Sequence, residues 1–177
     1  QRINTNFRIH KKLPKNLVKP IQKLQPVKIG AFTVEAFDVP HDSADCCGYT
    51  ITYNDKRFVL ITDCGKITEE VSSRALEADY LVLESNYDPQ MLETGPYPLH
   101  LRRRIACSTG HLSNTETAEF LRDNSFANLR QLFLCHLSEN NNTHELVDSA
   151  VSQALQDKNV PYHILDRRKV NGFFELD

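Results

Sequence analysis

The alternation of apolar and polar positions predicts strands in the first part of the chain. Ala31 to Val39 alternates in this way and predicts a strand that ends at Pro40-His41. Gly48 to Tyr53 predicts a second strand, and the almost wholly apolar stretch from Arg57 to Thr62 predicts a central one. Between these two strands, Asn54-Asp55 is a turn signal, so we expect a hairpin.

Helices and strands alternate along the rest of the chain. Apolar residues at helical spacing predict helices at Thr68 to Ala78, Pro98 to Ala106, Asn114 to Asp123 and Thr143 to Lys158. Short apolar runs predict buried strands at Tyr80 to Leu83 and Gln131 to Cys135, and short closing strands at Tyr162 to Leu165 and Phe173 to Leu176. Thr68 is the expected cap of the first helix, and Asn114 or Thr115 that of the third. The pattern predicts an α/β fold in which helices cover a sheet.

Composition indicates a single globular domain, residues 1–177. Of the 177 residues, 40% are hydrophobic and 25% are charged, which is atypical of a disordered chain. No apolar run approaches the length of a membrane span, so we expect no membrane partner. The five cysteines include the adjacent Cys46 and Cys47, and Cys64 and Cys135 at the ends of apolar runs. We interpret them as reduced, which indicates a cytoplasmic location.

The net charge of -2 is unevenly distributed. The segment before Glu35 has no acidic residue and contains eight basic ones: Arg2, Arg8, Lys11, Lys12, Lys15, Lys19, Lys23 and Lys28. The remainder contains 13 basic and 23 acidic residues. Residues 1–28 therefore form a basic lead-in that either contacts nucleic acid phosphates or is a solvated, irregular surface segment.

Candidate chemistry lies where the predicted strands end. His41, Asp63 and His136 each follow an apolar strand directly, where an open sheet presents ligands at one edge. Imidazole and carboxylate groups suit zinc, and also manganese or iron. On position alone, each of these residues could equally be a surface residue or a hydrogen-bonded one.

The residues around these positions carry a resemblance to a known family. The stretches are HDSADCCGY at 41–49, ITDCG at 61–65, GHLSN at 110–114 and CHLS at 135–138. In this order they resemble the later motifs of the metallo-β-lactamase superfamily, most closely those of its WalJ/YycJ group, with ribonuclease Z more distant. LESN at 83–86 and NNN at 140–142 also look like that group. The resemblance covers residues 30–165.

The resemblance implies a fold, a site and a chemistry. The fold would be an αββα sandwich. His41 and His136 would each be a terminal ligand of a different metal ion, and the carboxylate of Asp63 would bridge the two ions. His111 would assist proton transfer beside the scissile bond. Two divalent ions, zinc first and manganese or iron as alternatives, would activate water for phosphodiester hydrolysis in DNA or RNA.

The sequence departs from this family at its first motif, His-x-His-x-Asp-His. That motif is absent, and only His10 precedes His41. Each metal ion would then keep two protein ligands, whereas a catalytic zinc usually has three. We therefore expect this chain alone to be inactive and to bind metal weakly or not at all. We also expect it to be the C-terminal part of a longer hydrolase, with an apolar face that a homo-oligomer would bury.

Several residues keep two interpretations at this stage. Asp42 and Asp45 could orient the His41 ring through a hydrogen bond to the ring nitrogen that does not bind metal, as ligating histidines usually require. Alternatively, they could make local turns in the loop. His100 and the arginines 102–104 could contact phosphate or form a solvated helix face. Glu84 is a candidate for fixing a loop. Two other functions also remain open: hydrolysis of an ester or lactone on the same fold, and a non-catalytic domain that binds a partner.

Overall fold

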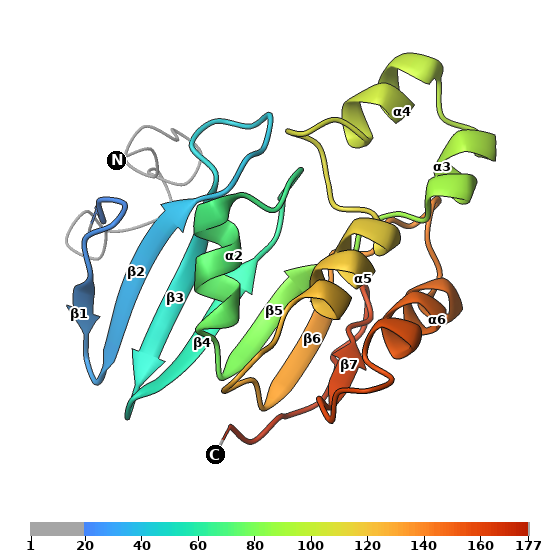
Figure 1. Cartoon of the computed structure of the whole chain (residues 1–177). Helices are drawn as coiled ribbons and strands as arrows, with labels where there is room; N and C mark the ends of the chain where they lie inside the picture. The colour runs from blue at the N-terminus through green and yellow to red at the C-terminus, as the bar shows by residue number, and fades with distance from the viewer. Residues whose placement is uncertain (1–19, 177) are drawn as a thin grey trace.

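One seven-stranded sheet organises residues 20–176, which are the residues that the computed structural model describes. Its strands lie side by side in chain order from β1 to β7, and helices pack against one of its faces (Figure 1). Predictions for residues 1–19 lie outside this part of the chain. The α/β class predicted from the sequence is confirmed.

The first half of the sheet is antiparallel. It contains β1 (Val27–Ile29), β2 (Phe32–Asp38), β3 (Cys47–Tyr53) and β4 (Lys56–Ile61). The β3–β4 hairpin turns at Asn54 and Asp55, whose φ values are +47° and +61°. A two-residue hairpin turn of type I′ requires a positive φ at both of its central residues. β1 was not predicted: its first two residues belong to the basic lead-in, for which an irregular surface segment was one of the two interpretations.

The second half of the sheet is parallel. β4 pairs with β5 (Tyr80–Glu84), β5 with β6 (Gln131–Cys135) and β6 with β7 (Tyr162–Ile164). Parallel neighbours need crossover connections, which α2 (Glu69–Leu76), α5 (Asn114–Asp123) and α6 (His144–Ala154) provide. The carboxyl ends of these strands therefore meet at one edge of the sheet.

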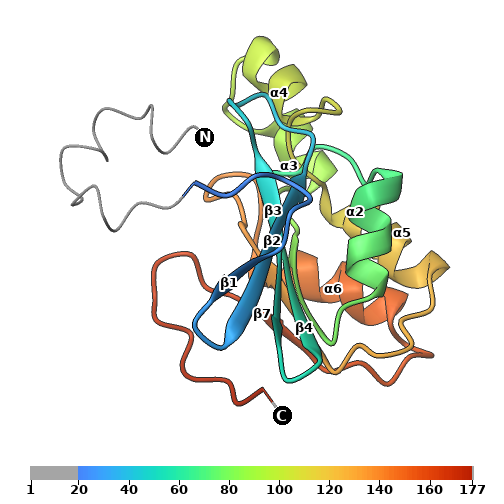
Figure 2. The same cartoon turned by 90° about the vertical axis from the view of Figure 1, so that its left-hand side faces the viewer.

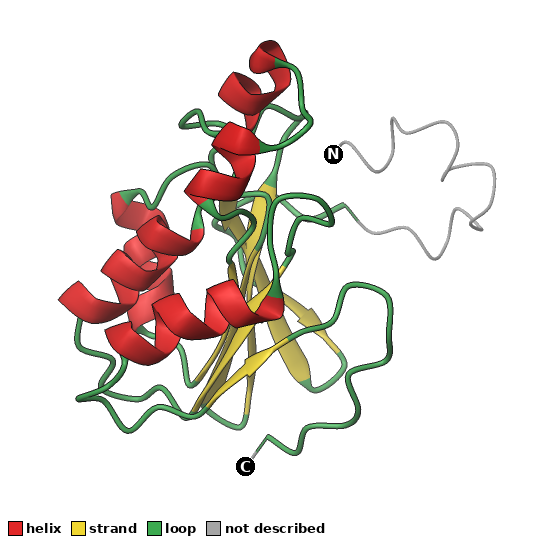
Figure 3. Ribbon diagram, turned by 90° about the vertical axis from the view of Figure 1, so that its right-hand side faces the viewer, coloured by secondary structure: helices red, strands yellow, loops and turns green. Residues whose placement is uncertain are grey.

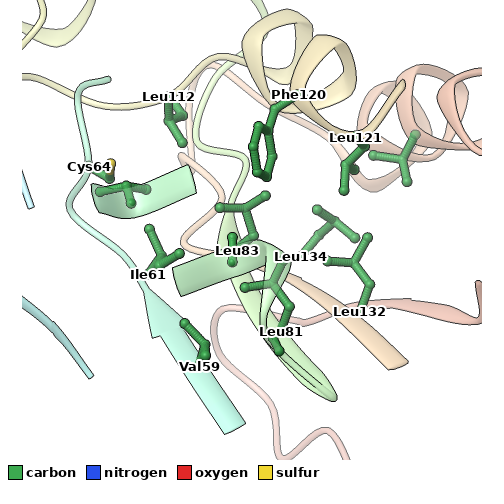
Figure 4. Packing of buried hydrophobic residues seen from close by; sticks show 14 of the residues in the cluster. Val59, Ile61, Cys64, Leu81, Leu83, Leu112, Phe120, Leu121, Leu132 and Leu134 are labelled. Carbon is green, nitrogen blue, oxygen red and sulfur yellow. The ribbon is translucent and has the colours of Figure 1, made fainter. Parts of the chain in front are cut away.

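The hydrophobic core lies between this sheet and its helices. Alternate residues of the central strands point toward the helices and are fully buried; they include Val59, Ile61, Leu81, Leu83, Leu132 and Leu134 (Figure 4). Leu121 of α5 and Val147 of α6 pack against them and are equally buried. Burying a side chain of this kind stabilises a fold by about 1.5–3 kcal/mol. This layer holds the strand ends in fixed relative positions.

On the opposite face of the sheet, aromatic side chains pack together. Of the described helices, α2, α5 and α6 lie on the first face, and the two remaining ones extend beyond the edge of the sheet (Figures 2 and 3). On the second face, the ring of Phe133 stacks on His163 with centroids 5.4 Å apart and meets Phe174 edge-on at 4.9 Å. The strand predicted at Phe173 to Leu176 is therefore wrong: this segment has no regular secondary structure, and Phe174 packs its ring against the sheet.

The predicted helices are all present, but α6 ends at Ala154, before the predicted Lys158, and two further features differ. Thr68 and Thr143 cap α2 and α6 through their hydroxyl groups, and α4 (Leu99–Ile105) lies where it was predicted. Ser113, and neither Asn114 nor Thr115, caps α5, in a capping box with Glu116. The six-residue helix α3 (Pro89–Thr94) was not predicted. None of the helices described is long and apolar enough to cross a bilayer.

Candidate metal centre

The predicted site residues meet at one edge of the sheet. β2 and β4 run in the same direction because each is antiparallel to β3, so His41 after β2 and Asp63 after β4 emerge at the same edge. Glu84 ends β5, and His136 follows β6 at this edge as well. The loop between α4 and α5 brings in His111, from the side where α3 and α4 extend beyond the sheet (Figure 1).

Asp63 is the centre of the arrangement. Its Oδ1 lies 3.6 Å from Nε2 of His41 and 3.6 Å from Nε2 of His136. Nδ1 of His111 lies 4.0 Å from the same oxygen. Three groups that are up to 95 residues apart in the sequence therefore converge around one carboxylate, which is half-exposed and open to solvent.

The orientation of the His41 ring is fixed by the backbone. Its Nδ1 donates a hydrogen bond of 2.8 Å to the carbonyl oxygen of Gly110, because a carbonyl can only accept. In the neutral imidazole, this leaves Nε2 with a free lone pair, and Nε2 is the atom that faces Asp63. A metal-ligating histidine typically has this arrangement, with one nitrogen held and the other available.

Glu84 orients the other two histidines. Its side chain is completely buried, and Oε1 accepts hydrogen bonds from Nδ1 of His111 at 2.6 Å and from Nδ1 of His136 at 2.8 Å. Oε2 accepts a third bond, of 2.7 Å, from the backbone N–H of Cys64. Burial raises the pKa of Glu84, but these bonds outweigh it, so the pKa is lowered overall. The hydrogen bond to Glu84 raises the pKa of His136, against the effect of burial.

The backbone is strained where two of these residues leave their strands. Asp63 has a φ of +54° and His136 a φ of +60°, in the left-handed region that residues with a Cβ rarely adopt. Such a conformation costs about 1–3 kcal/mol and tends to occur at functional sites. In both cases it turns the chain sharply just after the strand, where the side chain joins the cluster.

Hydrogen bonds tie the three loops at this edge together. The N–H of Asn86 donates to Leu112 O at 2.9 Å, and the N–H of Ser138 donates to Asn86 O at 2.7 Å. The buried amides of Asn114 and Asn142 exchange two hydrogen bonds, of 2.8 and 2.9 Å. The LESN and NNN stretches noted in the sequence therefore meet in one buried polar network beneath the site.

Asp42 and Asp45 lie on the loop after His41. Oδ1 of Asp42 is 3.8 Å from Nε2 of His41, and the carboxylate is bound by Arg104. Asp45 forms an ion pair of 3.1 Å with Lys23 of the basic lead-in. The bond that holds the His41 ring comes from Gly110, so a supporting role for Asp42 or Asp45 stays a prediction.

The arginines of α4 do not form one patch. Arg104 lines a small hollow beside His41, together with Asp42. Arg102 and Arg103 line a different hollow with Tyr87 and Leu92, and Arg102 also donates to the carbonyl of Glu93. His100 is exposed on the same helix. Arg104 is thus the member of this cluster that lies next to the candidate site.

The donor groups fit a pair of divalent cations. Within residues 20–176, two groups of three side chains could hold an ion: His41, Asp63 and His111, and Glu84, His111 and His136. Neither contains both His41 and His136, although Nε2 of each lies at the same distance from Asp63. His41, Asp63 and His136 would supply donor atoms to such ions. Two imidazoles and a carboxylate are donors that zinc accepts.

A family profile described as "Beta-lactamase superfamily domain" matches residues 1–137 of the chain. The chain belongs to the beta-lactamase superfamily. Its fold resembles that of the metallo-β-lactamase fold protein YhfI from Bacillus subtilis, with a TM-score of 0.66 at 19% identity over 92% of this chain and 60% of that one. Zn(2+)-bound PqqB from Methylobacterium extorquens is also similar, with a TM-score of 0.60 at 17% identity over 91% and 55%. The metallo-β-lactamase fold is therefore confirmed.

The resemblance to the WalJ/YycJ group is confirmed as well. The exodeoxyribonuclease YycJ of Bacillus anthracis is 36% identical over 129 residues, which cover 73% of this chain and 49% of that protein. The chain thus spans about half the length of this relative.

Sequence reasoning underestimated one residue of the site. Glu84 was considered only as a carboxylate that could fix a loop, yet it contacts both His111 and His136. The available signal was its position: like Asp63, it directly follows a wholly apolar central strand. A carboxylate at such a place needs several hydrogen-bond donors, which a histidine-rich sheet edge can supply.

Proposed function

We propose that this chain carries part of the active site of a metal-dependent phosphodiesterase that acts on nucleic acid. One observation carries the proposal: Nε2 of His41 and Nε2 of His136 face the same oxygen of Asp63 from 3.6 Å each. In both rings, Nδ1 is engaged in a hydrogen bond, with Gly110 or Glu84. Both Nε2 atoms are therefore available as ligands.

His41 and Asp63 would hold one ion, and Asp63 and His136 the other. When bound, a pair of divalent ions lowers the pKa of a shared water and stabilises charge on a phosphoryl oxygen. The carboxylate of Asp63 offsets part of the repulsion between two such charges. Zinc suits these donors best, and manganese and iron are the alternatives.

His111 is the candidate proton donor to the leaving oxygen. Its Nδ1 is held by Glu84, so its Nε2 can carry or accept a proton. The lowered pKa of Glu84 favours the charged carboxylate, which accepts the hydrogen bonds from the Nδ1 atoms of both rings. Glu84 would thus act as a positioning residue for His111 and His136 together.

Nucleic acid is the substrate class that we propose. The relative YycJ, which is 36% identical over 129 residues, is named an exodeoxyribonuclease. The acidic remainder of the chain opposes indiscriminate binding, so recognition would depend on the site itself.

This chain supplies two protein ligands to each ion, fewer than the three of a typical catalytic zinc. We therefore propose that the chain on its own binds metal weakly and is inactive. The homo-oligomer expected from the sequence stays a prediction.

The test is hydrolysis of bis(p-nitrophenyl) phosphate and of a DNA oligonucleotide by the product of the complete gene, loaded with zinc or manganese. His111→Ala should lower turnover by about 10²–10⁴-fold and leave the bound metal in place. Asp63→Ala should remove both metal and activity. If the two variants lost metal equally, the proposed role of His111 would be wrong.

Two other outcomes would replace the proposal. Much faster cleavage of p-nitrophenyl esters than of either phosphodiester would make the protein an ester or lactone hydrolase. Near-zero metal content after loading would favour a domain that only binds a partner.

A further inference from the structure

A cavity of about 480 Å³ lies beside the histidine cluster, on the side away from His41. Asn86, Tyr97, His111, His136, Arg167 and Asn171 are among the residues that line it. We call it the Tyr97 cavity. Its volume falls within the range of about 300–1,000 Å³ that is typical of sites for small organic groups. A substrate phosphate bound at His111 and His136 would lie at its mouth.

One wall of the Tyr97 cavity is an aromatic ring held in place. Tyr97 lies in the short connection between α3 and α4, and its hydroxyl oxygen accepts a hydrogen bond of 2.9 Å from Nδ2 of Asn140. Asn140 belongs to the loop after β6, so the ring is tied to the same loop as His136. A fixed ring of this kind is a stacking platform for a nucleic acid base.

A positive charge lies in the wall that the C-terminal segment provides. Arg167 lines the cavity and is about half exposed, and its Nη1 is 3.7 Å from Oε2 of Glu139. Arg168 also pairs with Glu139, and Lys169 pairs with Asp166. Three cations therefore pair with two carboxylates, so this surface segment carries a net positive charge; of its members, Asp166 and Arg167 line the cavity. An exposed guanidinium is well suited to bind a phosphate.

The opposite side of His111 offers less space. The hollow beside His41 has a volume of about 160 Å³, and its cation, Arg104, is already bound to Asp42. Among residues 20–176, the Tyr97 side therefore offers a nucleoside attached to a phosphate at the cluster the larger space.

We propose that the Tyr97 cavity is a nucleotide subsite: the base of the nucleoside next to the scissile phosphate stacks on Tyr97, and Arg167 binds the following phosphate of the strand. This inference rests on the proposed function, since it assigns the residues that recognise the nucleic acid substrate. Tyr97 and Arg167 would thus bind the substrate without contacting the candidate metal centre.

The experiment measures binding rather than turnover, so that it applies to this chain even if the chain is inactive. Fluorescein-labelled hexathymidylate is titrated with the protein, with and without zinc, and binding is followed by fluorescence anisotropy at several salt concentrations. Tyr97→Leu should weaken binding about tenfold, because base stacking on an aromatic ring is lost. Tyr97→Phe keeps the ring and should stay within about twofold of the wild type.

The charge is tested with a matched pair of variants. Arg167→Gln should reduce the slope of log K against log salt by about 0.7, the value for one phosphate contact on a single strand. Arg122→Gln, at the far end of α5, removes the same charge and should leave the slope unchanged. Contacts from the basic lead-in are common to all variants and cancel in the comparison.

Two results would overturn the inference: equal losses in Tyr97→Phe and Tyr97→Leu, or equal slopes in Arg167→Gln and Arg122→Gln. Circular dichroism checks that each variant is folded. Failure of the proposed function would look different, since the complete gene product would then hydrolyse no phosphodiester while these binding differences could still be measured.

Discussion

The buried carboxylate of Glu84 accepts a hydrogen bond of 2.6 Å from Nδ1 of His111, at a position with no exposure to solvent. The same oxygen also accepts a bond from His136. A buried charge is tolerated only when donors surround it, and here two of the three donors are histidines of the candidate site. One side chain thus sets the orientation of two imidazoles.

Replacing Glu84 with Gln should therefore weaken metal binding in the complete gene product. Both carboxylate oxygens accept bonds, but an amide offers one acceptor and one NH₂ group, which would face an N–H donor. We expect zinc affinity to fall about 10–100-fold, the usual range when a partner of a ligating histidine is lost. Competition with a fluorescent chelator measures this change.

The control for that variant is Glu93→Gln, which removes an exposed carboxylate on α3. It should bind zinc like the wild type. An unchanged zinc affinity in Glu84→Gln would mean that Glu84 does not support the metal ligands.

Asn142→Ala should destabilise the fold without touching the site. The Asn142 amide is buried and donates to the carbonyl oxygens of Ser85 and Asn86, at 2.9 Å each. Its removal leaves buried acceptors unpaired, so we expect the free energy of unfolding to fall by about 1–3 kcal/mol in urea denaturation. Asn128→Ala, at an exposed position, should change it little. Similar stabilities for the two variants would contradict the structural role of this network.

Cys107 should be the most reactive thiol at neutral pH. It is exposed, and a hydrogen bond with the Thr109 hydroxyl lowers its pKa, whereas burial raises the pKa of Cys64 to about 12. Since the thiolate is the nucleophile, alkylation of Cys107 should rise with pH at a lower midpoint than that of an unfolded-state cysteine.

Iodoacetamide labelling with peptide mapping across pH gives the midpoint for Cys107. Thr109→Val removes the hydroxyl and should move that midpoint upward. Faster labelling of Cys64 than of Cys107 in the folded protein would contradict this account.

Much of the fold could be predicted from the sequence, because strongly periodic segments determine their own structure. β6 was predicted with its observed bounds, and the turn residues Asn54 and Asp55 identified the hairpin. Two short elements escaped prediction: β1, which begins inside the basic lead-in, and α3, whose six residues are too few for a helical pattern. Phe173 to Leu176 has the composition of a strand, but lies beyond the last strand of the sheet.

The convergence of the site residues was predictable in part. The sequence placed His41, Asp63 and His136 at one edge of the sheet, because each follows a predicted strand. The structure brings these three residues together at that edge. The role of Glu84 could not be read from the sequence, because it depends on two histidine rings turning toward one buried oxygen. The hydrogen bond between His41 and the carbonyl oxygen of Gly110 could not be predicted either, because every residue has a backbone carbonyl whatever its type.

The most direct test of the metal centre is a zinc-edge anomalous difference map from crystals of this chain soaked in millimolar zinc, a concentration that compensates for weak binding. We predict peaks within ligand distance of Asp63 Oδ1, one bound by His41 Nε2 and the other by His136 Nε2. Zinc bound elsewhere on the molecule with no peak at Asp63 would contradict the account.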